Sequence, residues 1–504
     1  MIISFDFQKE DYPETSFSIA SILAKFSDSG SIKLEHQSYN LRGLIGKDKS
    51  IIERRIISEF KNKFSKSIDN YSFIALSAYS WSENLVQMLV NYIRPNFSGK
   101  IILGGYEITA LPKKELIDVY ENVDYYIKGH AEFALEEIFS GRTNDSVLDF
   151  PLRNKDLVSP YLTGILPLNT KKIYWESKRG CSYTCGFCEW GNSLKGKVYR
   201  LDDDRLDKEL ELFSKYKFEE INVIDATFLL TQKDIEIFRK LLDIPNTKIT
   251  FQVRFEKIDS ELGNRFLSIC EKNRDRVSLE FGLQTIHVVE MKSINRVNNL
   301  DSVKRVMSKL NQKEIDYSVS IIYGIPGQTI DSFDETINFI KDNGCVKFSA
   351  FPLQIPKNSA IHRNKERNQV KEHSGQSFSL SFVKESYSFT ESDWEQMCEK
   401  TGQPFIGDPL VERTHFQDMC TSNPGMFIYF KDNGNHLTLE KESELIDIRL
   451  EKNNESEIQT GINTIHFKHI MKYSYFHGDI YDIENNNQKY RVKLAGSGNI
   501  YLIY

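Results

Sequence analysis

The sequence lacks the features typical of membrane, secreted and nucleic-acid-binding proteins. No stretch approaches the roughly 18 to 20 uninterrupted apolar residues that a membrane span needs. The segment after Met1 meets Asp6, Lys9 and Glu10 before an apolar signal core can form. Lys and Arg number 65 against 71 Asp and Glu, a net charge of -6, so the basic excess of a nucleic-acid or anionic-membrane binder is absent. These absences favour a cytoplasmic protein with no membrane span and no nucleic-acid partner.

Cysteine is also scarce, with 7 residues in a chain of 504. The number is odd and three of the seven lie close together, which argues against a secreted disulfide framework. Clustered thiols in a reducing compartment usually bind metal. The remaining composition, 40% hydrophobic and 27% charged, is ordinary for a globular protein and excludes disordered, collagen-like and coiled-coil chains. At the usual domain size, the length predicts about three domains.

Residues 1–141 alternate short apolar runs with helical patterns. Strands regularly separated by helices are typical of a doubly wound parallel sheet, which binds ligands outside the carboxyl ends of its strands. The expected strands are Ile2–Phe5, Ile32–His36, Phe73–Ser77, Ile101–Gly104 and Tyr125–Ile127.

Two strand ends of this first domain carry candidate ligand-binding residues. Ser77 and Tyr79 lie at the end of the third expected strand, and Gly104, Gly105 and Glu107 lie at the end of the fourth. Small residues at such positions let a backbone approach a ligand closely. The alternative is that the two glycines only make a tight turn from strand to loop.

Residues 142–170 are rich in turn formers and are expected to be a linker, and residues 171–356 show a second rhythm of strands and helices. Six strand-helix repeats suggest a partial parallel barrel, whose chemistry should lie at the carboxyl ends of the strands. The expected strands are Lys172–Glu176, Ile221–Asp225, Ile249–Arg254, Val277–Leu283, Tyr317–Tyr323 and Phe348–Gln354.

A C-x3-C-x2-C run, Cys181, Cys185 and Cys188, follows the first of these strands. Three thiolates on one short loop can each bind one iron of a [4Fe-4S] cluster and leave the fourth iron open to another ligand. Zinc is the competing hypothesis, but a structural zinc site usually has four protein ligands in paired units. Spacing and position favour the cluster, because the remaining cysteines are isolated: Cys270, Cys345, Cys398 and Cys420.

With the aromatic Phe187 before its last cysteine, this run resembles the signature of the radical S-adenosylmethionine (SAM) superfamily, which follows the first strand of a partial (β/α)6 barrel. The first domain resembles the cobalamin-binding domain of the B12-dependent branch, so the resemblance covers about residues 1–360. It implies that Cys181, Cys185 and Cys188 are the metal ligands and the catalytic centre, holding a [4Fe-4S] cluster whose open iron is chelated by SAM. It also implies an electron donor such as flavodoxin or ferredoxin.

The resemblance assigns SAM contacts to further strand ends. Asp225 and Thr227 occupy the segment expected to contact the SAM amino group, and the alternative is that they cap the next helix. Arg254 could hold the SAM carboxylate through a two-pronged contact, or form an ordinary salt bridge with a neighbouring Glu.

Two more strand ends complete the expected SAM site. Glu280 and Gln284 would face inward with Gly282 if the even face of the fourth strand lines the barrel, and could then bind the ribose hydroxyls. Gly324 and Gly327 resemble the glycine-rich segment that runs beside the adenine. The alternative is that these two glycines only allow the chain to turn in a loop.

The match to cobalamin domains is partial. Many of them carry a D-x-H-x-x-G motif, an S-x-L segment and a Gly-Gly pair. Ser77 and the pair 104–105 match the later elements, with Tyr79 where Leu is usual, but the segment from Asp6 to Thr15 contains no histidine. Several radical enzymes of this branch bind cobalamin without a protein imidazole, so cobalamin is still the expected cofactor. The alternative is a domain that has lost the corrinoid and serves as a lid.

Residues 357–504 form an accessory region, with a short helix expected at Glu391–Thr401 and a β-rich unit after it. In related multi-domain enzymes substrate recognition varies in this region. The substrate, a small molecule or a peptide, is not indicated by any motif.

The resemblance therefore implies a B12-dependent radical SAM enzyme that cleaves SAM to a 5'-deoxyadenosyl radical and modifies an unactivated carbon, with methyl transfer from methylcobalamin as the favoured outcome. Cyclisation, ring modification or oxidation with the same cofactors is the enzymatic alternative. A non-catalytic corrinoid or redox sensor, and a zinc-stabilised binding protein, are the alternatives from other classes.

Replacing Cys181, Cys185 or Cys188 by Ala is expected to abolish cluster binding and SAM cleavage, because each thiolate binds a different iron. Iron, sulfide and zinc analysis after anaerobic purification, with assay of 5'-deoxyadenosine, measures both. A triple variant that keeps the cluster and cleaves SAM, or stoichiometric zinc without iron and sulfide, would contradict the assignment.

Overall fold

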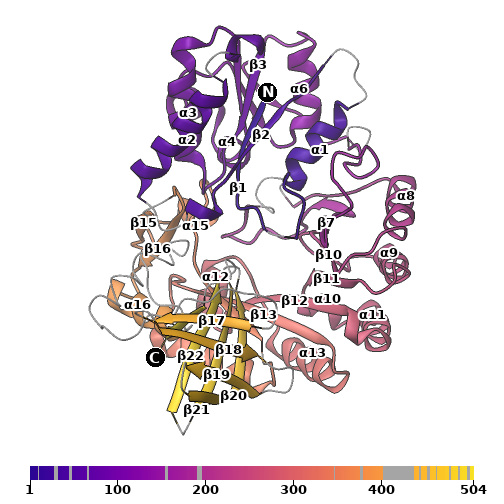
Figure 1. Cartoon of the computed structure of the whole chain (residues 1–504), viewed down its shortest axis with the longest axis vertical. Helices are drawn as coiled ribbons and strands as arrows, with labels where there is room; N and C mark the ends of the chain where they lie inside the picture. The colour runs from indigo at the N-terminus through magenta and orange to yellow at the C-terminus, as the bar shows by residue number, and fades with distance from the viewer. Residues whose placement is uncertain are drawn as a thin grey trace.

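The computed structural model describes residues 1–400 except 10, 28–31, 45–47, 65–66, 154–156, 190–195, 346 and 375–377, and beyond residue 400 only the backbone of seven strands between 436 and 503. Two six-stranded parallel sheets with flanking helices follow each other along the chain, which confirms the α/β fold class (Figure 1). No helix in the described part combines the length and the apolar character needed to cross a membrane.

The first sheet has the strand order β2-β1-β3-β4-β5-β6. Four strands lie where the sequence predicts them, but β2 begins only at His36, and β6 comes from the segment expected to be a linker. β2 is a polar strand at the sheet edge and β6 is only three residues long, so neither has an apolar run that would reveal it. The strands are β1 (Ile2–Asp6), β2 (His36–Asn40), β3 (Phe73–Ser77), β4 (Lys100–Gly104), β5 (Tyr125–Lys128) and β6 (Val147–Asp149).

Helices cover both faces of the first sheet, with α1 and α6 on one side and α2 and α3 on the other (Figure 1). α2 shows why they pack there: Ile52, Ile56, Phe60 and Phe64 recur every four residues and are buried. The helices are α1 (Phe17–Lys25), α2 (Lys49–Phe64), α3 (Glu83–Ile93), α4 (Tyr106–Ala110), α5 (Lys113–Val119) and α6 (Ala131–Phe139).

The second sheet has the strand order β14-β13-β12-β11-β10-β7 and all its pairs are parallel, as a partial barrel requires. Its strands are β7 (Lys172–Trp175), β10 (Glu220–Val223), β11 (Lys248–Val253), β12 (Val277–Gln284), β13 (Asp316–Tyr323) and β14 (Phe348–Pro352). The helices between them are α8 (Asp203–Phe213), α9 (Gln232–Leu242), α10 (Phe255–Ile258), α11 (Glu261–Lys272), α12 (Val288–Ser293), α13 (Leu300–Gln312) and α14 (Ile330–Asp342).

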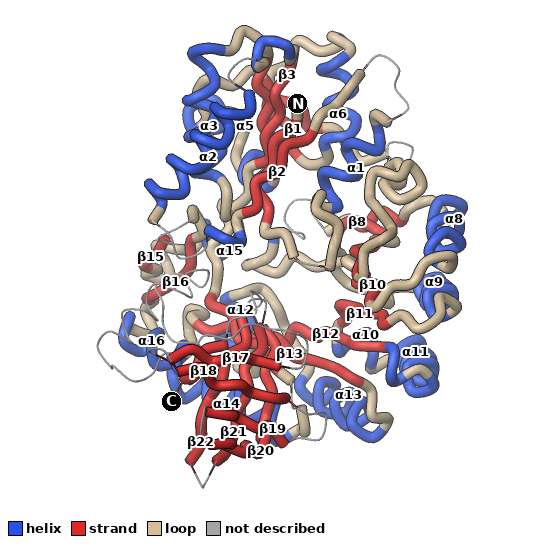
Figure 2. The backbone as a smooth tube through the Cα atoms, in the orientation of Figure 1, coloured by secondary structure: helices blue, strands red, loops and turns tan. Residues whose placement is uncertain are grey.

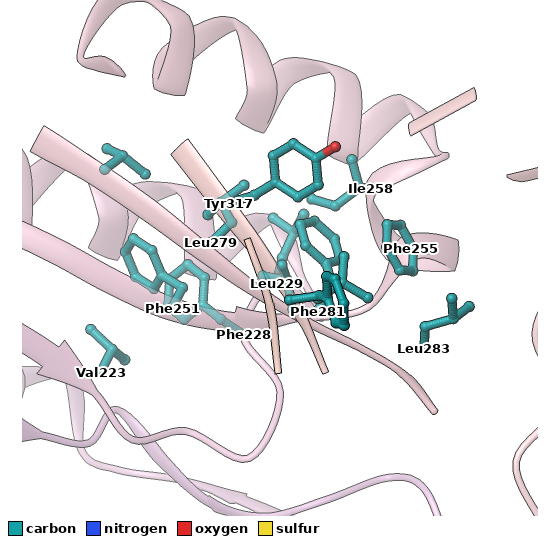
Figure 3. Packing of buried hydrophobic residues seen from close by; sticks show 14 of the residues in the cluster. Val223, Phe228, Leu229, Phe251, Phe255, Ile258, Leu279, Phe281, Leu283 and Tyr317 are labelled. Carbon is teal, nitrogen blue, oxygen red and sulfur yellow. The ribbon is translucent and has the colours of Figure 1, made fainter. Parts of the chain in front are cut away.

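The two faces of the second sheet differ in polarity. The apolar face packs against the helices and forms the main core, part of which Figure 3 shows around Phe228, Phe251 and Phe281. The opposite face is polar: Glu220 accepts a 2.9 Å hydrogen bond from Thr250, and polar residues follow on β12 and β13. This alternation places polar side chains inside the partial barrel, as expected for the even face of its fourth strand.

A C-terminal region follows the barrel and is drawn beside it in Figure 2. Trp394 of α16 is buried against Phe382 and Tyr323, so this helix joins the barrel core. The described elements are α15 (Ala360–Arg363), β15 (Lys371–Ser374), β16 (Ser381–Glu385), α16 (Glu391–Lys400) and an antiparallel sheet of β17 (His436–Lys441), β18 (Glu444–Leu450), β19 (Glu455–Thr460), β20 (Asn463–Tyr475), β21 (Gly478–Asn485), β22 (Gln488–Ala495) and β23 (Ile500–Ile503).

Replacing Gly105 by Ala is expected to destabilise the carboxyl edge of the first sheet by about 2–4 kcal/mol. Gly105 has φ +97° and ψ -179°, which only glycine adopts readily, and a Cβ there would collide with the Ala78 carbonyl oxygen. Thermal unfolding of the full chain measures the loss. Gly104→Ala is the matched control, since its Cβ would come no closer than 3.9 Å to Ile127; equal Tm values for the two variants would contradict the prediction.

Candidate functional site

The thiol loop begins where the first barrel strand ends. After β7 the chain forms β8 (Lys178–Gly180), which pairs with β9 (Val198–Arg200), and the three cysteines follow at once. Cys181 and Cys185 are 8% and 7% exposed, while Cys188 is half-buried. Phe187 is partly buried against the barrel core. The thiols therefore lie at the carboxyl edge of the second sheet, as the sequence predicts.

The donor set of this loop fits an iron-sulfur cluster. Within the described ranges, no three His, Cys, Asp or Glu side chains are arranged to hold a single metal ion. A [4Fe-4S] cluster requires a different arrangement, because each cysteine binds a separate iron. Arg296 donates to Cys185 Sγ at 3.6 Å, and Thr227 Oγ1 lies 3.8 Å from Cys181 Sγ. Hydrogen bonds of this kind to the sulfurs tune a bound cluster.

Asp225 holds the segment that leads into the thiol loop. Its carboxylate accepts hydrogen bonds from the backbone N–H groups of Ser177 and Lys178, at 2.7 and 3.2 Å, and from the Ser177 hydroxyl at 2.5 Å. Lys178 Nζ lies 3.4 Å from the same carboxylate. Asp225 is fully buried, so the structure gives it a positioning role, and its direct contact with SAM stays a prediction.

Arg254 and Tyr183 form a stacked pair beside the cysteines. The Arg254 guanidinium lies 3.8 Å from the centre of the Tyr183 ring, and its Nε donates to Glu256 at 3.2 Å. The salt bridge weighed as the alternative role of Arg254 is thus present in the structure. Since Tyr183 belongs to the thiol run itself, the pair places a cation next to the expected SAM position.

The even face of β12 carries Glu280, Gly282 and Gln284 as expected, but the strand ends in a bulge. Gln252 on the neighbouring strand lies 3.5 Å from Glu280, so the carboxylate faces the barrel interior. The register shifts between Gly282 and Gln284, and Gln284 has φ +70°. The side-chain amide of Gln284 lies over Gly282, and Arg296 donates a hydrogen bond to the Gly282 carbonyl oxygen.

The glycine-rich turn after β13 contacts the C-terminal region. Gly324 has φ +81°, and a Cβ there would lie 2.9 Å from Trp394 Nε1. Gly327 has φ +100°, and its N–H donates to the Ser388 hydroxyl at 2.8 Å. Both glycines therefore permit close packing of residues 383–394 against this turn. This agrees with the alternative in which they serve only the loop conformation, and their contact with adenine remains a prediction.

The carboxyl edge of the first sheet brings its predicted residues together. Tyr79 stacks on Trp81 with ring centres 4.7 Å apart, and Ser77 ends β3 beside Gly104 of β4. Gly105 makes the tight turn from strand to helix, and Glu107 on α4 donates its backbone N–H to Ala78 at 3.2 Å.

Glu107 is a buried carboxyl group at this edge. Lys357 Nζ lies 3.2 Å from its Oε2 and also pairs with Glu83. Burial nevertheless raises the pKa of Glu107 to about 7, although Lys357 opposes the rise. A large share of this carboxyl group is therefore protonated near neutral pH.

The thiol loop lies against the same edge. Glu189, directly after Cys188, lies near Ser80 of the first domain, and burial together with the charge of Glu107 raises the pKa of Glu189 to about 8. Burial and the charges of Glu189 and Cys188 also raise the pKa of Tyr106 on α4. The carboxyl ends of both sheets thus face each other across this contact.

A cavity of about 470 Å³ opens beside this contact. Both domains and the segment after the barrel line it, so it lies between parts of the chain far apart in sequence. Among the described residues that line it, cationic side chains outnumber the one carboxylate, Asp149. The cations are Lys128, Lys197, Lys357 and Arg363, and His130 and Tyr199 add further polar lining.

Sequence reasoning missed three residues of the site: Tyr183, Glu189 and Arg296. Tyr183 and Glu189 adjoin the cysteine run, and their position in the motif could have marked them. Arg296 lies in a loop after α12, more than a hundred residues beyond the thiols, and carries no local signal. Cys420 lies outside the described residues, and Cys270, Cys345 and Cys398 are buried.

Residues 175–340 match the family model of the radical SAM superfamily. The barrel is a radical SAM domain. This match covers the thiol loop and the barrel strand ends from Asp225 to Gly327, and it confirms the radical SAM resemblance inferred from the cysteine spacing.

Relatives with curated names are similar to the radical SAM domain and its surroundings. The cobalamin-dependent radical SAM methyltransferase TokK of Streptomyces tokunonensis is 22% identical over 308 residues, 54% of this chain and 45% of TokK. The 2-(S-pantetheinyl)-carbapenam-3-carboxylate methyltransferase of Streptantibioticus cattleyicolor is 23% identical over 319 residues, 56% of this chain and 46% of that protein. The chain thus spans about half the length of these relatives.

Solved structures share the fold beyond the radical SAM domain. The radical SAM methyltransferase TsrM from Kitasatospora setae matches with a TM-score of 0.57 and 10% identity, over 80% of this chain and 88% of TsrM. The cobalamin-dependent SAM radical enzyme OxsB matches with a TM-score of 0.54 and 12% identity, over 84% of this chain and 67% of OxsB. The arrangement of a parallel sheet before the radical SAM barrel is therefore a known one.

The raised pKa of Glu107 predicts a pH-dependent stability. The folded protein keeps a proton on this carboxyl up to about pH 7, whereas the unfolded chain loses it near 4.5. The stabilisation of the folded state by protonated Glu107 is fully present below pH 4.5. It is lost as the pH rises towards 7, and the free energy of unfolding falls by about 3 kcal/mol at most. Glu107→Gln cannot titrate, so its Tm should fall less between pH 5 and pH 8 than the wild-type Tm.

Thermal unfolding across this pH range provides the measurement. Glu115→Gln, at an exposed position on α5, is the matched control and should follow the wild-type curve. A Glu107→Gln curve parallel to the wild type would show that Glu107 does not carry the dependence.

Proposed function

We propose that this chain is a B12-dependent radical SAM enzyme that modifies an unactivated carbon, most simply by methyl transfer. The observation that carries the proposal is the proximity of the thiol loop to the carboxyl edge of the first sheet, where Glu189 lies near Ser80 and Glu107, and Cys188 and Glu189 lie near Tyr106. Parallel sheets bind ligands at this edge, so two cofactor sites that face each other could act on one substrate.

In this proposal Cys181, Cys185 and Cys188 hold a [4Fe-4S] cluster, SAM occupies the polar side of the barrel, and cobalamin lies on the first sheet near Ser77, Tyr79 and residues 104–107. When bound, the cluster would supply an electron for cleavage of SAM, and cobalamin would carry a methyl group. The names of TokK and TsrM, both methyltransferases, support methyl transfer as the outcome.

The residues of the chain would bind and orient these groups. Arg254 and Arg296 both lie beside Cys185 and could pair with the SAM carboxylate, while Thr227 lies at Cys181. Glu280 and Gln284 on β12 remain the proposed partners of the ribose hydroxyls. Arg296 has a buried Nε without a hydrogen-bond partner in the described part of the chain, so one donor remains to be satisfied by a ligand.

The interior of the site would protect reactive groups from water. Cys181 and Cys185 are buried, and Tyr79, Trp81 and Tyr106 cover the facing edge. A dry site of this kind limits side reactions of a radical. The substrate is proposed to be a small molecule or a peptide, and the electron donor an external protein such as flavodoxin or ferredoxin.

Anaerobic reconstitution with iron and sulfide, followed by SAM and a strong reductant with or without cobalamin, tests the proposal. Mass spectrometry should detect 5'-deoxyadenosine and S-adenosylhomocysteine, the latter only with cobalamin. Deoxyadenosine alone would favour radical chemistry without methylation. Neither product from a fully loaded cluster, with candidate substrates and an active reductant supplied, would favour a sensor.

A further inference from the structure

A buried ion triad joins the two domains directly in front of the thiol loop. Arg179, two residues before Cys181, donates its Nε to both oxygens of Glu176, at 2.8 and 3.1 Å, and its NH1 to Glu132 at 2.7 Å. Glu176 follows β7 of the barrel, whereas Glu132 lies in the first turn of α6 of the first domain. One guanidinium thus bridges two carboxylates from different domains.

The burial of the triad makes it costly to disturb. Arg179, Glu132 and Glu176 are 7%, 3% and 5% exposed. Removing a charge from water is expensive unless it is paired, so such a group holds its partners in one geometry. The planar fork of arginine also fixes direction as well as distance, which a lysine would not do.

The triad lies on the path between the first sheet and the cysteines. α6 packs on the first sheet, and Gly180, with φ +94°, separates Arg179 from Cys181. A shift of α6 would therefore pull on Arg179 and move the start of the thiol loop. Other contacts keep the domains together, among them Tyr12 stacked on Tyr174 at 4.3 Å, so loss of one triad bond does not separate them.

We propose that Arg179 is a positioning residue that couples the placement of the first domain to the thiol loop through Glu132. The expected effect on the reaction rests on the function proposed above. In that function the distance between the two cofactor sites depends on the Arg179–Glu132 ion pair, whereas the assembly of each cofactor site by itself does not.

Glu132→Gln tests the coupling, because it removes the charge between the domains and leaves the Arg179–Glu176 pair within the barrel. Glu137→Gln is the matched control on the same helix, since Glu137 pairs with Arg142 at 2.7 Å at the protein surface. Hydrogen–deuterium exchange of the full, reconstituted chain should speed up at residues 178–188 in Glu132→Gln and not in Glu137→Gln. Unchanged exchange at 178–188, or equal change in both variants, would overturn the proposal.

Product analysis supplies the second readout. Glu132→Gln should keep its iron content, the electron paramagnetic resonance signal of its reduced cluster and its deoxyadenosine yield within about twofold of the wild type. Its cobalamin-dependent S-adenosylhomocysteine should fall about 10- to 100-fold, because a misplacement of about 1 Å has such an effect. Equal losses of both products would indicate a general structural role and overturn the proposal.

The exchange experiment separates this inference from the proposed function. If the wild-type chain forms no S-adenosylhomocysteine, the proposed methyl transfer fails, yet faster exchange at 178–188 in Glu132→Gln alone would still show the coupling. Glu176→Gln is a comparison variant, because it weakens the Arg179–Glu176 pair within the barrel. It should reduce the yields of both 5'-deoxyadenosine and S-adenosylhomocysteine.

Discussion

The thiol loop depends on buried charge pairs behind it. Asp225 binds the backbone of Ser177 and Lys178, and the Lys178 ammonium also pairs with Asp234 at 2.8 Å. These groups are almost fully removed from water, so each must keep its partner or lose several kcal/mol. These contacts hold the carboxyl ends of β7 and β10 next to each other. They thereby fix the position at which the thiol loop begins.

Two sheets built on the same plan then lie with their carboxyl ends close together. Each is parallel, sheets of this kind bind ligands at the carboxyl ends of their strands, and these two edges come together where Glu189 lies near Ser80. Gly105 lets the chain turn closely at one edge, and burial raises the pKa of Glu107 there to about 7. The arrangement is the one on which the proposed two-cofactor chemistry depends.

Periodicity predicted most of the secondary structure because burial determines it locally. All six barrel strands lie within a few residues of their expected positions. Polar or short strands escape such a pattern: β2 begins at His36 and not at Ile32, and β6 lies within the segment predicted to be a linker. These strands form because a neighbouring strand offers hydrogen bonds, which the pattern of apolar residues does not record.

The sequence by itself determined the chemistry of the loop, since the spacing of Cys181, Cys185 and Cys188 is a local property of the chain. Tertiary structure decided which side chains surround it. Arg296 and Glu132 come from distant segments, and Trp394 occupies the space beside Gly324. Such contacts exist only after the sheets and helices pack, because burial forces distant charged and polar groups to find partners.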